Sequence, residues 1–486
     1  MKLNVLTGTI PDKFEIIGNA ETEIANICID SRKVQAGDLF VCTPGTVMDA
    51  HAFAPQAVEH GAVALMVDHV LDLNVPQVVV PDVRKALSYI AAQFNGNPAR
   101  KMHLIGITGT KGKTTTSFLI KSILEEAGHK VGLIGTVCCM IGDETIPAKL
   151  TTPDPLVTQN QLRMMADAGV DYVVMEVSAH ALRLNRLAGM RFEVGAFSNF
   201  SQDHLDFFSS MDDYFDCKMT FFDPAYTDRI VYNADDERVA EGFEALGRPA
   251  LRIGIRASSD FYANDIEVGE RGCSFLMSWH KHFRVAVALK LSGIFNVYNA
   301  LMAAAICASV GVDCDTIRRG LEDVRAVPGR IELLDTGTPY RVILDYAHSP
   351  DSLENILKAV RQTTKGRMIA LFGCGGNRDA GKRPIMGEIG GELADFCILT
   401  SDNPRNEDPN EILKAIEEGI RGTECPYVVI ENRREAIRYA LKSAQPSDVI
   451  VLAGKGHETY QEICGVRHPF DEKIVVAELL REMEEE

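Results

Sequence analysis

Short apolar runs alternate with longer amphipathic segments through most of this chain. A short run rich in β-branched residues is typical of a buried strand, and apolar residues three and four positions apart are typical of a helix. Strands that alternate with helices in this way predict βαβ units and a mostly parallel sheet. The apolar runs lie at 27–32, 36–41, 62–67, 77–80, 104–108, 130–136, 170–177, 195–199, 341–345, 368–372, 396–400, 427–430 and 448–452.

Two clusters of turn-forming residues divide the 486 residues into three predicted α/β domains. One cluster lies at 95–98, just before a glycine-rich loop, and the other at 327–330 closes the next series of elements. A chain of this length is too long for a single core. We therefore expect an N-terminal α/β domain at 1–100, a central domain with a mostly parallel sheet at 101–330, and a C-terminal doubly wound, Rossmann-like domain at 331–486.

Composition and charge exclude several classes of protein. The net charge of −18 argues against a nucleic-acid or anionic-membrane partner, because such partners attract basic surfaces. No apolar stretch is long enough for a membrane span, and the N-terminus lacks the apolar core of a secretory signal. The twelve cysteines include no C-x-x-C pair and lie among apolar residues, so we expect reduced thiols and a cytoplasmic location.

The sequence GTKGKT at 109–114 predicts a phosphate-binding loop, since an apolar strand run precedes it and an amphipathic helix follows. In such a loop, backbone N–H groups and the helix N-terminus hold phosphates, the lysine reaches the terminal phosphate, and the hydroxyl binds Mg²⁺. Ile107 stands where the usual motif has its first glycine, which leaves the subfamily open. An ordinary strand-to-helix turn is the alternative.

Polar residues follow several predicted strands, and ligands gather at these ends in open parallel sheets. Glu176 is a candidate Mg²⁺ ligand, with a helix cap or surface acid as the alternative. Lys218 lies among aromatic residues, where an ammonium is costly unless it is paired or modified; a surface lysine with a packed stem is the alternative. Polar clusters in the third domain predict a second ligand site; they lie at 345–350, 373–379, 401–405 and 453–458.

These motifs resemble those of the Mur ligases, the ATP-dependent amino-acid ligases that build the peptide stem of peptidoglycan. The resemblance covers essentially the whole chain, in the same order, through GTKGKTT at 109–115, MEVSAH at 175–180, NFSQDHLD at 199–206, DYAH at 345–348 and GKGHE at 454–458. It implies a substrate-binding N-terminal domain, a central P-loop-type ATPase domain and an amino-acid-binding C-terminal domain. It also implies a part in cell-wall synthesis and, through it, in cell shape and division.

The resemblance implies ATP and Mg²⁺ as cofactors and an acyl-phosphate intermediate. The implied catalytic residues are Lys113, Glu176, His204 and Lys218. The implied metal ligands are Thr114, Glu176, His204 and Lys218, the last as a carbamate (N6-carboxylysine). The implied ATP-binding residues are Gly109, Thr110, Lys111, Gly112, Lys113, Thr114, Thr115, Asn296, Arg330 and Asp345.

Within the family, SDNPRNED at 401–408 is similar to the segment of members that add meso-2,6-diaminopimelate to UDP-N-acetylmuramoyl-L-alanyl-D-glutamate. The resemblance implies two sets of substrate contacts. For the UDP-sugar dipeptide they are Ser31, Thr46, Thr151, Thr152, Ser178 and Arg186; for diaminopimelate they are Arg378, Asp402, Asn403, Pro404, Arg405, Gly454 and Glu458.

The chemistry of Arg405 favours diaminopimelate over lysine, because an arginine fork binds a second carboxylate and is left unpaired by lysine. A lysine-adding member, another Mur ligase, a folylpolyglutamate synthetase and a regulatory P-loop NTPase are the alternatives. We further expect small-molecule substrates, no nucleic-acid or membrane partner, and a monomer.

Overall fold

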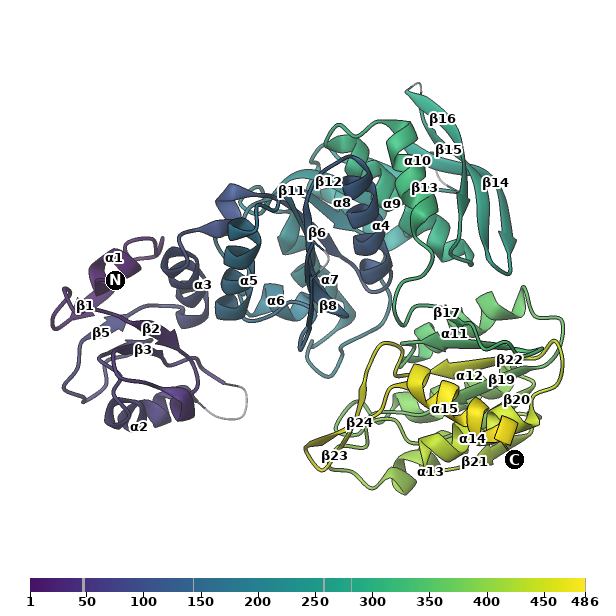
Figure 1. Cartoon of the computed structure of the whole chain (residues 1–486). Coiled ribbons are helices and arrows are strands. Elements are labelled where there is room, and N and C mark those ends of the chain that lie inside the picture. Colours follow the sequence, from purple (N-terminus) through teal and green to yellow (C-terminus); the bar gives the residue numbers. More distant parts are fainter. Residues whose placement is uncertain (46–48, 143, 257, 281, 486) are drawn as a thin grey trace. The chain divides into compact units, whose positions relative to one another are not determined.

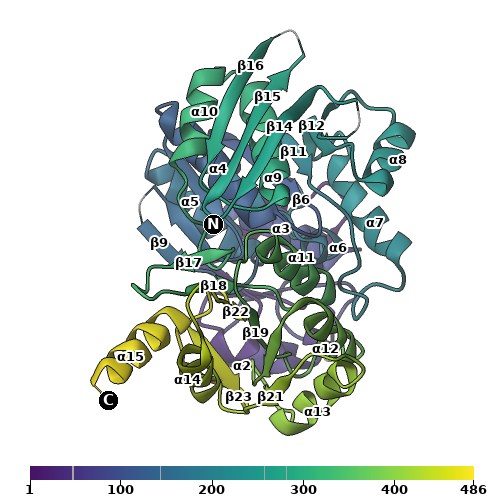
Figure 2. The same cartoon turned by 90° about the vertical axis from the view of Figure 1, so that its right-hand side faces the viewer.

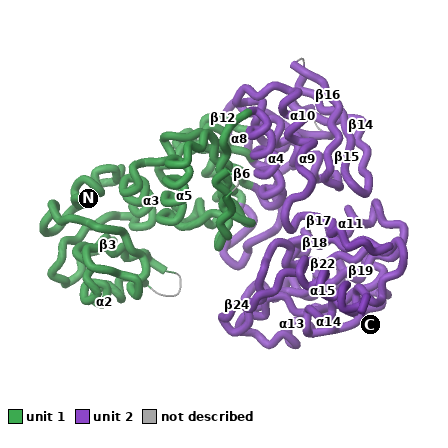
Figure 3. Tube along the Cα trace, viewed as in Figure 1, with its two compact units in different colours: residues 1–108, 128–196, 215–230 green, residues 109–127, 197–214, 231–486 purple. Residues whose placement is uncertain are grey.

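The chain forms two compact units, each assembled from several segments (Figure 3). Unit 1 comprises residues 1–108, 128–196 and 215–230, and unit 2 comprises residues 109–127, 197–214 and 231–486. The computed structural model describes residues 1–45, 49–142, 144–256, 258–280 and 282–485, and Figure 1 labels their helices and strands. In these ranges, no helix has the length and apolar character needed to cross a membrane.

The first hundred residues contain a five-stranded sheet with two apolar faces. The elements are α1 (Leu3–Thr7), β1 (Glu15–Ile17), β2 (Asn26–Cys28), η1 (Ser31–Lys33), β3 (Asp38–Val41), η2 (Ala50–Phe53), α2 (Ala54–Glu59), β4 (Ala64–Val67), β5 (Gln77–Val79), α3 (Val83–Phe94) and η3 (Pro98–Lys101). The strand order is β1-β5-β4-β3-β2, and all pairs are parallel except β1 with β5. Leu39 packs in the cluster that holds Ile90 of α3, whereas Phe40 packs with Ala57 of α2. The parallel pairs confirm the predicted parallel strands, and the alternation of side chains buries both faces of the sheet.

The rest of unit 1 is built on a second sheet that carries the strand before the glycine loop. Its elements are β6 (His103–Thr108), β7 (Val131–Ile134), β8 (Cys138–Ile141), β9 (Glu144–Pro147), α5 (Pro155–Asp167), β10 (Tyr172–Glu176), α6 (Ala179–Arg183), β11 (Phe192–Phe197), α7 (Met211–Met219), η4 (Thr220–Phe222) and β12 (Thr227–Asn233). The order here is β12-β11-β6-β10-β7-β8-β9. Strands β6, β10 and β7 are parallel, and Glu176 lies opposite Ile107 in the register. The predicted strand runs are therefore confirmed.

The first part of unit 2 combines helices with an antiparallel ribbon. Its elements are α4 (Lys113–Glu126), α8 (Glu237–Leu246), β13 (Leu251–Gly254), β14 (Phe261–Gly269), β15 (Gly272–Trp279), β16 (Phe283–Leu289), α9 (Ile294–Ser309) and α10 (Cys314–Asp323). Strand β13 is parallel to β14, and β14, β15 and β16 are antiparallel. Helix α9 is buried over most of its length and packs against α4. Its alanines allow that close approach, because each carries only a methyl group.

The last part of unit 2 is a doubly wound sheet (Figures 1 and 2). Its elements are β17 (Glu332–Leu334), β18 (Arg341–Asp345), α11 (Pro350–Arg361), β19 (Met368–Phe372), α12 (Lys382–Leu393), β20 (Phe396–Leu399), α13 (Pro409–Ile420), β21 (Tyr427–Val429), α14 (Arg433–Ser443), β22 (Val449–Ala453), β23 (Tyr460–Ile463), β24 (Val466–Pro469) and α15 (Glu472–Glu485). The order is β17-β18-β22-β19-β20-β21, parallel from β18 to β21.

Helices cover both faces of this last sheet. Ile343 packs in a cluster with residues of α11, α12 and α13, whereas its neighbour Leu344 packs in a cluster with residues of α14 and α15. Three successive crossovers run outward from β18 to β21, and the chain then returns to place β22 between β18 and β19. A change of winding direction of this kind opens a crevice at the carboxyl ends of the central strands. The Rossmann-like prediction is confirmed.

Helices α12 and α13 approach each other through glycines. A Cβ on Gly419 would lie 1.8 Å from the carbonyl oxygen of Pro384, and one on Gly387 would lie 2.0 Å from that of Ile416. Both obstacles are backbone atoms, which cannot move without shifting a helix. Only glycine fits at either position.

We expect Gly419→Ala to lower the free energy of unfolding by about 1–3 kcal/mol, because the added methyl group overpacks this helix pair. The shift in the urea midpoint measures the loss. Gly422→Ala is the matched control, since its Cβ would meet its nearest neighbour, the Gly419 oxygen, at an ordinary 3.5 Å. Equal midpoints for the two variants would contradict the packing argument.

Candidate functional site

The loop between β6 and α4 has the backbone geometry of a phosphate cradle. Gly109 and Gly112 have φ angles of 136° and 83°, which side chains disfavour. A Cβ on Gly109 would lie 2.0 Å from Ser198 Oγ, and one on Gly112 would lie 2.4 Å from Asn299 Oδ1. Gly112 caps α4 without a side-chain acceptor, which suits an anion at the positive end of the helix. The ordinary-turn alternative does not account for this geometry.

Lys113 is folded back over the loop that it follows. Its Nζ donates hydrogen bonds to the carbonyl oxygens of Gly109 at 2.8 Å and Thr110 at 2.9 Å. The ammonium therefore lies on the loop, where a bound phosphate has to meet a cation. Thr114 and Thr115 are buried in the first turn of α4.

Asn199, which follows β11, holds the peptide of Lys111 on both sides. Its Oδ1 accepts the Lys111 N–H at 2.8 Å, its Nδ2 donates to the Lys111 oxygen at 3.0 Å, and its own carbonyl accepts the Thr110 N–H at 2.8 Å. Ser198 Oγ donates to the same Lys111 oxygen at 2.6 Å. Neither residue is among the predicted nucleotide-binding residues; their position after an apolar strand was the available signal.

A group of charged residues lies beside the loop. Lys111 Nζ donates to Ser349 Oγ at 2.8 Å and lies 3.9 Å from Asp203 Oδ2. Burial raises the pKa of Asp203, but the charges of Lys111 and His204 outweigh that effect and lower it to about 2. Burial and the neighbouring lysines lower the pKa of His348 to about 4. The group thus keeps an ionised carboxylate next to a neutral imidazole at neutral pH.

Predicted nucleotide residues further along the chain also reach this loop. Arg330 Nη2 donates to Thr114 Oγ1 at 3.2 Å, and its guanidinium lies 5.1 Å from the centre of the Tyr346 ring. The Nε of Arg330 is buried and has no hydrogen-bond partner among the described residues, as expected where a ligand supplies the acceptor. Asp345 Oδ2 accepts the Ile331 N–H at 2.8 Å, and burial raises the pKa of this carboxyl.

Asn296 lies inside α9 and does not cap it. Its Nδ2 donates to the Ser292 oxygen at 2.8 Å, and its Oδ1 accepts from Asn299 at 3.0 Å. The Oδ1 of Asn299 in turn accepts from Thr116 Oγ1 at 3.4 Å. Gly293 occupies the cap position, so Asn296 has no capping role in this helix.

In unit 1, Glu176 is a buried carboxylate at the end of β10. It is 1% exposed, and its oxygens accept the Thr136 N–H and the Thr136 hydroxyl, both at 2.9 Å. A Cβ on Gly135 would lie 2.3 Å from Glu176 Oε1, so the glycine makes room for the carboxylate. The surface-acid alternative for Glu176 is wrong. Thr136 is a functional candidate that we did not predict.

The predicted residues for the UDP-sugar dipeptide cluster next to Glu176. Thr152 Oγ1 donates to the Glu176 carbonyl at 2.7 Å, and the Ser178 N–H donates to Thr152 Oγ1 at 3.0 Å. Arg186 Nη1 donates to the Thr152 carbonyl at 2.7 Å, and Thr151 Oγ1 lies 3.1 Å from that of Thr136. The structure therefore brings four of the six predicted residues together.

The remaining two predicted residues lie in the N-terminal part of the chain. Ser31 begins η1, and its hydroxyl donates to Gln56 Oε1 at 3.3 Å. Thr46 lies outside the described residues. Asn185 also joins this part of the chain to the residues around α6, because its Nδ2 donates to Asp82 at 2.9 Å and its carbonyl accepts from Ser88 at 2.6 Å.

Lys218 lies near the end of α7 and is 1% exposed. The preceding Cys217 Sγ donates to the carbonyl of Ala179, the first residue of α6, at 3.3 Å. The interpretation of Lys218 as a surface lysine is therefore wrong. An ammonium taken out of water to this degree requires compensation by partners or by modification.

The predicted amino-acid residues gather at the carboxyl edge of the last sheet. Asn403 Nδ2 donates to Glu458 Oε2 at 2.9 Å, and a Cβ on Gly454 would lie 2.6 Å from Asp402 Oδ2. Arg405, in the left-handed region with φ 51°, donates from Nη1 to the Gly376 carbonyl at 2.8 Å.

Two further neighbours complete this amino-acid group. A Cβ on Gly375 would lie 2.9 Å from Arg405 Nη1 and 3.9 Å from Arg378 Cγ, so both arginines lie next to that glycine. The carbonyl of Pro404 lies where a Cβ on Gly376 would stand. All seven predicted residues thus belong to the loops after β19, β20 and β22.

Two other groups of side chains do not overlap the predicted sites. His51, Asp68 and His69 lie close enough to share an ion. However, His51 already pairs through Nδ1 with Asp49 at 2.6 Å and accepts the Asp68 N–H through Nε2 at 3.3 Å. Both ring nitrogens of His51 therefore have partners within the protein, and the group links the segments of Asp49 and Asp68.

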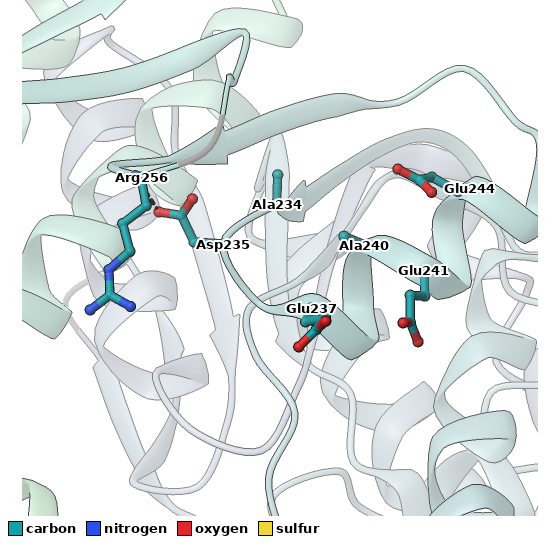
Figure 4. Close-up of a pocket in the computed structure, with 7 residues that line it drawn as sticks. All are labelled: Ala234, Asp235, Glu237, Ala240, Glu241, Glu244 and Arg256. Atoms are coloured by element: carbon teal, nitrogen blue, oxygen red, sulfur yellow. Dashed lines mark hydrogen bonds between the residues drawn. The ribbon is translucent and has the colours of Figure 1, made fainter.

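A pocket in unit 2 is acidic (Figure 4). Glutamates of α8 line it, together with Asp235, which accepts the Arg256 N–H at 2.8 Å. Negative charge of this density disfavours phosphate. Its lining residues are Ala234, Asp235, Glu237, Ala240, Glu241, Glu244 and Arg256.

Three protein-family models match successive segments of the chain. The Mur ligase family catalytic domain matches residues 23–95, the Mur ligase middle domain matches residues 107–307, and the glutamate ligase domain of Mur ligases matches residues 329–456. These matches confirm the three-domain architecture. The boundaries that we placed at 100 and 330 stay a prediction.

Two relatives that match over almost the whole chain are ligases of the same name. The UDP-N-acetylmuramoyl-L-alanyl-D-glutamate–2,6-diaminopimelate ligase of Caldanaerobacter subterraneus subsp. tengcongensis is 45% identical over 474 residues, 97% of this chain and 98% of the relative. That of Geobacillus thermodenitrificans is 44% identical, with 99% and 100% covered. A solved structure of a ligase with the same name superposes with a TM-score of 0.70 at 31% identity, covering 100% of this chain and 99% of that one.

We expect Asn199→Ala to weaken binding of Mg²⁺-ATP about tenfold or more, since it removes two hydrogen bonds that shape the loop, each contributing about 0.5–1.5 kcal/mol. Titration calorimetry measures the change. Asn410→Ala, at an exposed position in the first turn of α13, is the control and should bind as wild type does. Unchanged affinity in Asn199→Ala would show that the loop keeps its shape without this side chain.

Proposed function

We propose that this chain, which belongs to the Mur ligase family, is an ATP-dependent ligase that adds meso-2,6-diaminopimelate to UDP-N-acetylmuramoyl-L-alanyl-D-glutamate in peptidoglycan synthesis. The full-length identity to ligases of that name is the observation that carries the proposal. The residues of the glycine loop and of the charged loops at the strand ends of the last sheet also support this proposal.

The first step transfers the γ-phosphoryl group of ATP to the γ-carboxylate of the D-glutamate residue. A carboxylate oxygen forms the new bond to phosphorus, and ADP leaves. The chain's own task is to align two anions and to place cations around the transferring group. We assign the terminal phosphate to Lys113 and the nucleotide to the glycine loop, Asn296, Arg330 and Asp345.

Mg²⁺ neutralises charge on the phosphoryl oxygens when it is bound, and we assign it to Thr114, Glu176, His204 and Lys218. Hydroxyl, carboxylate and imidazole groups form a suitable donor set. The buried position of Lys218 supports its conversion to a carbamate, in which the neutral amine adds to CO₂ and releases a proton. The product is an anion that oxygen-preferring cations bind.

The second step forms the amide bond. The diaminopimelate amine attacks the carbonyl carbon of the acyl phosphate, the tetrahedral intermediate expels phosphate, and the nitrogen loses a proton. We assign the distal carboxylate to Arg378 and Arg405, which both lie near Gly375, and the distal ammonium to Asp402 and Glu458. A pocket with both signs of charge suits the zwitterionic end of diaminopimelate better than the single ammonium of lysine.

We assign the UDP-sugar dipeptide to the group of residues around Thr152. Hydroxyls of Thr151 and Ser178 and the guanidinium of Arg186 offer donors to the anionic UDP-sugar dipeptide, and we assign Ser31 and Thr46 to the same substrate. The cytoplasmic location and the monomeric state stay predictions.

The choice of amino acid is tested with a phosphate-release assay that contains ATP, Mg²⁺ and the UDP-sugar dipeptide. Wild type should turn over meso-diaminopimelate, and lysine at least about a hundredfold more slowly, since lysine brings no distal carboxylate to Arg405. Arg405→Ala should lose most of that preference. Equal rates with both amino acids in wild type would favour the lysine-adding alternative. Phosphate release with a folate or with the UDP-sugar tripeptide, but not the dipeptide, would favour the other ligases.

We expect Lys218→Ala to lower ligation at least about a hundredfold, because a Mg²⁺ ligand is lost. Bicarbonate or formate should partly restore the rate by placing an anion in the vacated space. Lys365→Ala is the control, since that side chain is 84% exposed. Near-normal activity of Lys218→Ala would overturn the carbamate proposal.

A further inference from the structure

Lys455, in the loop after β22, is a fully buried ammonium that neither the ATP site nor the predicted amino-acid contacts include. Its Nζ donates to Glu458 Oε2 at 3.0 Å and to Asn403 Oδ1 at 3.1 Å, and it lies 3.8 Å from Asp402 Oδ1. The ring of Tyr460 lies on another side, with its centre 5.7 Å from the nitrogen. A buried lysine with this many acceptors is fixed in one position.

All three polar partners of Lys455 belong to the predicted diaminopimelate site. Asp402 and Asn403 come from the loop after β20, whereas Glu458 comes from the loop after β22. Asn403 and Lys455 donate to the same oxygen of Glu458, at 2.9 and 3.0 Å. Because these two loops are about fifty positions apart in sequence, the ammonium is a cross-link between them.

The ammonium also balances charge. Its nitrogen lies 3.8 Å from Asp402 and 3.0 Å from Glu458, so without it these two carboxylates would lose a shared cation in a largely buried site, where like charges repel strongly. One carboxylate would turn away or take up a proton. Either change removes an acceptor from the place where the substrate ammonium is expected.

A second buried cation, Arg433, contacts the backbone of the same two loops. Arg433, itself fully buried, donates to the carbonyl of Ala453 at 2.9 Å and of Ser401 at 3.5 Å, and it pairs with Glu472 at 2.8 Å. Arg433 therefore holds the backbone at the bases of the loops, whereas Lys455 reaches the side chains that face the amino acid. Of these two buried cations, Lys455 is the one that contacts the side chains of Asn403 and Glu458.

We propose that Lys455 is a positioning residue that holds Asp402, Asn403 and Glu458 in place to receive the ammonium of the distal amino-acid centre of diaminopimelate. The inference rests on the proposed function. The distal carboxylate is left to Arg378 and Arg405. Lys455 therefore determines how well the enzyme recognises the distal amine, and the arginines determine how well it recognises the distal carboxylate.

The test compares three amino acids in the phosphate-release assay with Lys455→Met. Diaminopimelate carries both distal groups, 2-aminopimelate lacks the distal amine, and lysine lacks the distal carboxylate. We expect the variant to raise KM for diaminopimelate about thirtyfold, a loss of about 2 kcal/mol of binding. Its KM for ATP should change less than about twofold, because the nucleotide residues are untouched. The preference for diaminopimelate over 2-aminopimelate should fall about tenfold or more, whereas the preference over lysine should persist.

Conservative variants separate positioning from folding. Lys455→Arg keeps the charge and should restore most of the lost preference, and Lys455→Gln keeps one donor without charge and should fall between Arg and Met. Thermal melting reports whether each variant is folded; if Lys455→Met is not, the Gln and Arg variants decide. An unchanged preference for diaminopimelate over 2-aminopimelate in a folded Met or Gln variant would overturn the inference. Wild type that fails to use diaminopimelate at all would instead overturn the proposed function.

Discussion

Parallel strand pairing is the constraint on which every candidate site in this chain depends. Strands that run in the same direction end at the same edge of a sheet, so the loops that follow them meet there. In unit 1, the pairing of β10 with β6 places Glu176 opposite Ile107, two positions before the glycine loop begins. A slip of one residue would turn Glu176 to the other face of the sheet and leave the Thr136 donors without it.

The last sheet uses the same constraint for a different purpose. Strands β18, β22, β19 and β20 are neighbours, and their carboxyl ends carry Asp345, Gly454, Gly373 and Ser401. The sequence order of these strands differs from their spatial order, so loops that are distant in the chain become adjacent. The amino-acid residues therefore assemble without any long insertion, from short segments at the ends of buried strands.

Several charges at these edges are buried to a degree that stability alone does not explain. Glu176, Lys218, Arg433 and Lys455 are each at most 1% exposed. Replacing a buried ion pair such as Arg433–Glu472 by well-packed apolar residues is often neutral or stabilising. Three of these charges nevertheless hold loops in place: Glu176 accepts from Thr136 after β7, and Arg433 and Lys455 contact the loops after β20 and β22. Their value lies in holding one arrangement of polar groups against the alternatives that flexible loops would sample.

Hydrophobic periodicity predicted most of the strands and the winding of the last sheet, because those elements alternate between two buried faces. The hairpin of β23 and β24 was not predicted, since its residues are largely exposed and carry no such pattern. The contacts of Asn199 with Lys111 and of Lys455 with Asn403 were not predicted either. These are pairings between loops 88 and 52 positions apart, and no local pattern reports them. Motif resemblance supplied the predicted catalytic residues, and the residues that contact them came only from the structure.

The net charge of this chain is negative, whereas several cations gather at the glycine loop. A net charge of −18 would repel an anionic substrate if charges acted at long range. Salt at physiological strength screens exposed charges beyond about 8 Å, so an anion at the glycine loop responds mainly to its neighbours. Those neighbours are the cations of Lys111, Lys113 and Arg330, together with the positive N-terminus of α4. The net charge therefore disfavours large anionic partners such as nucleic acids, whereas the cations at the strand ends determine which small anions bind.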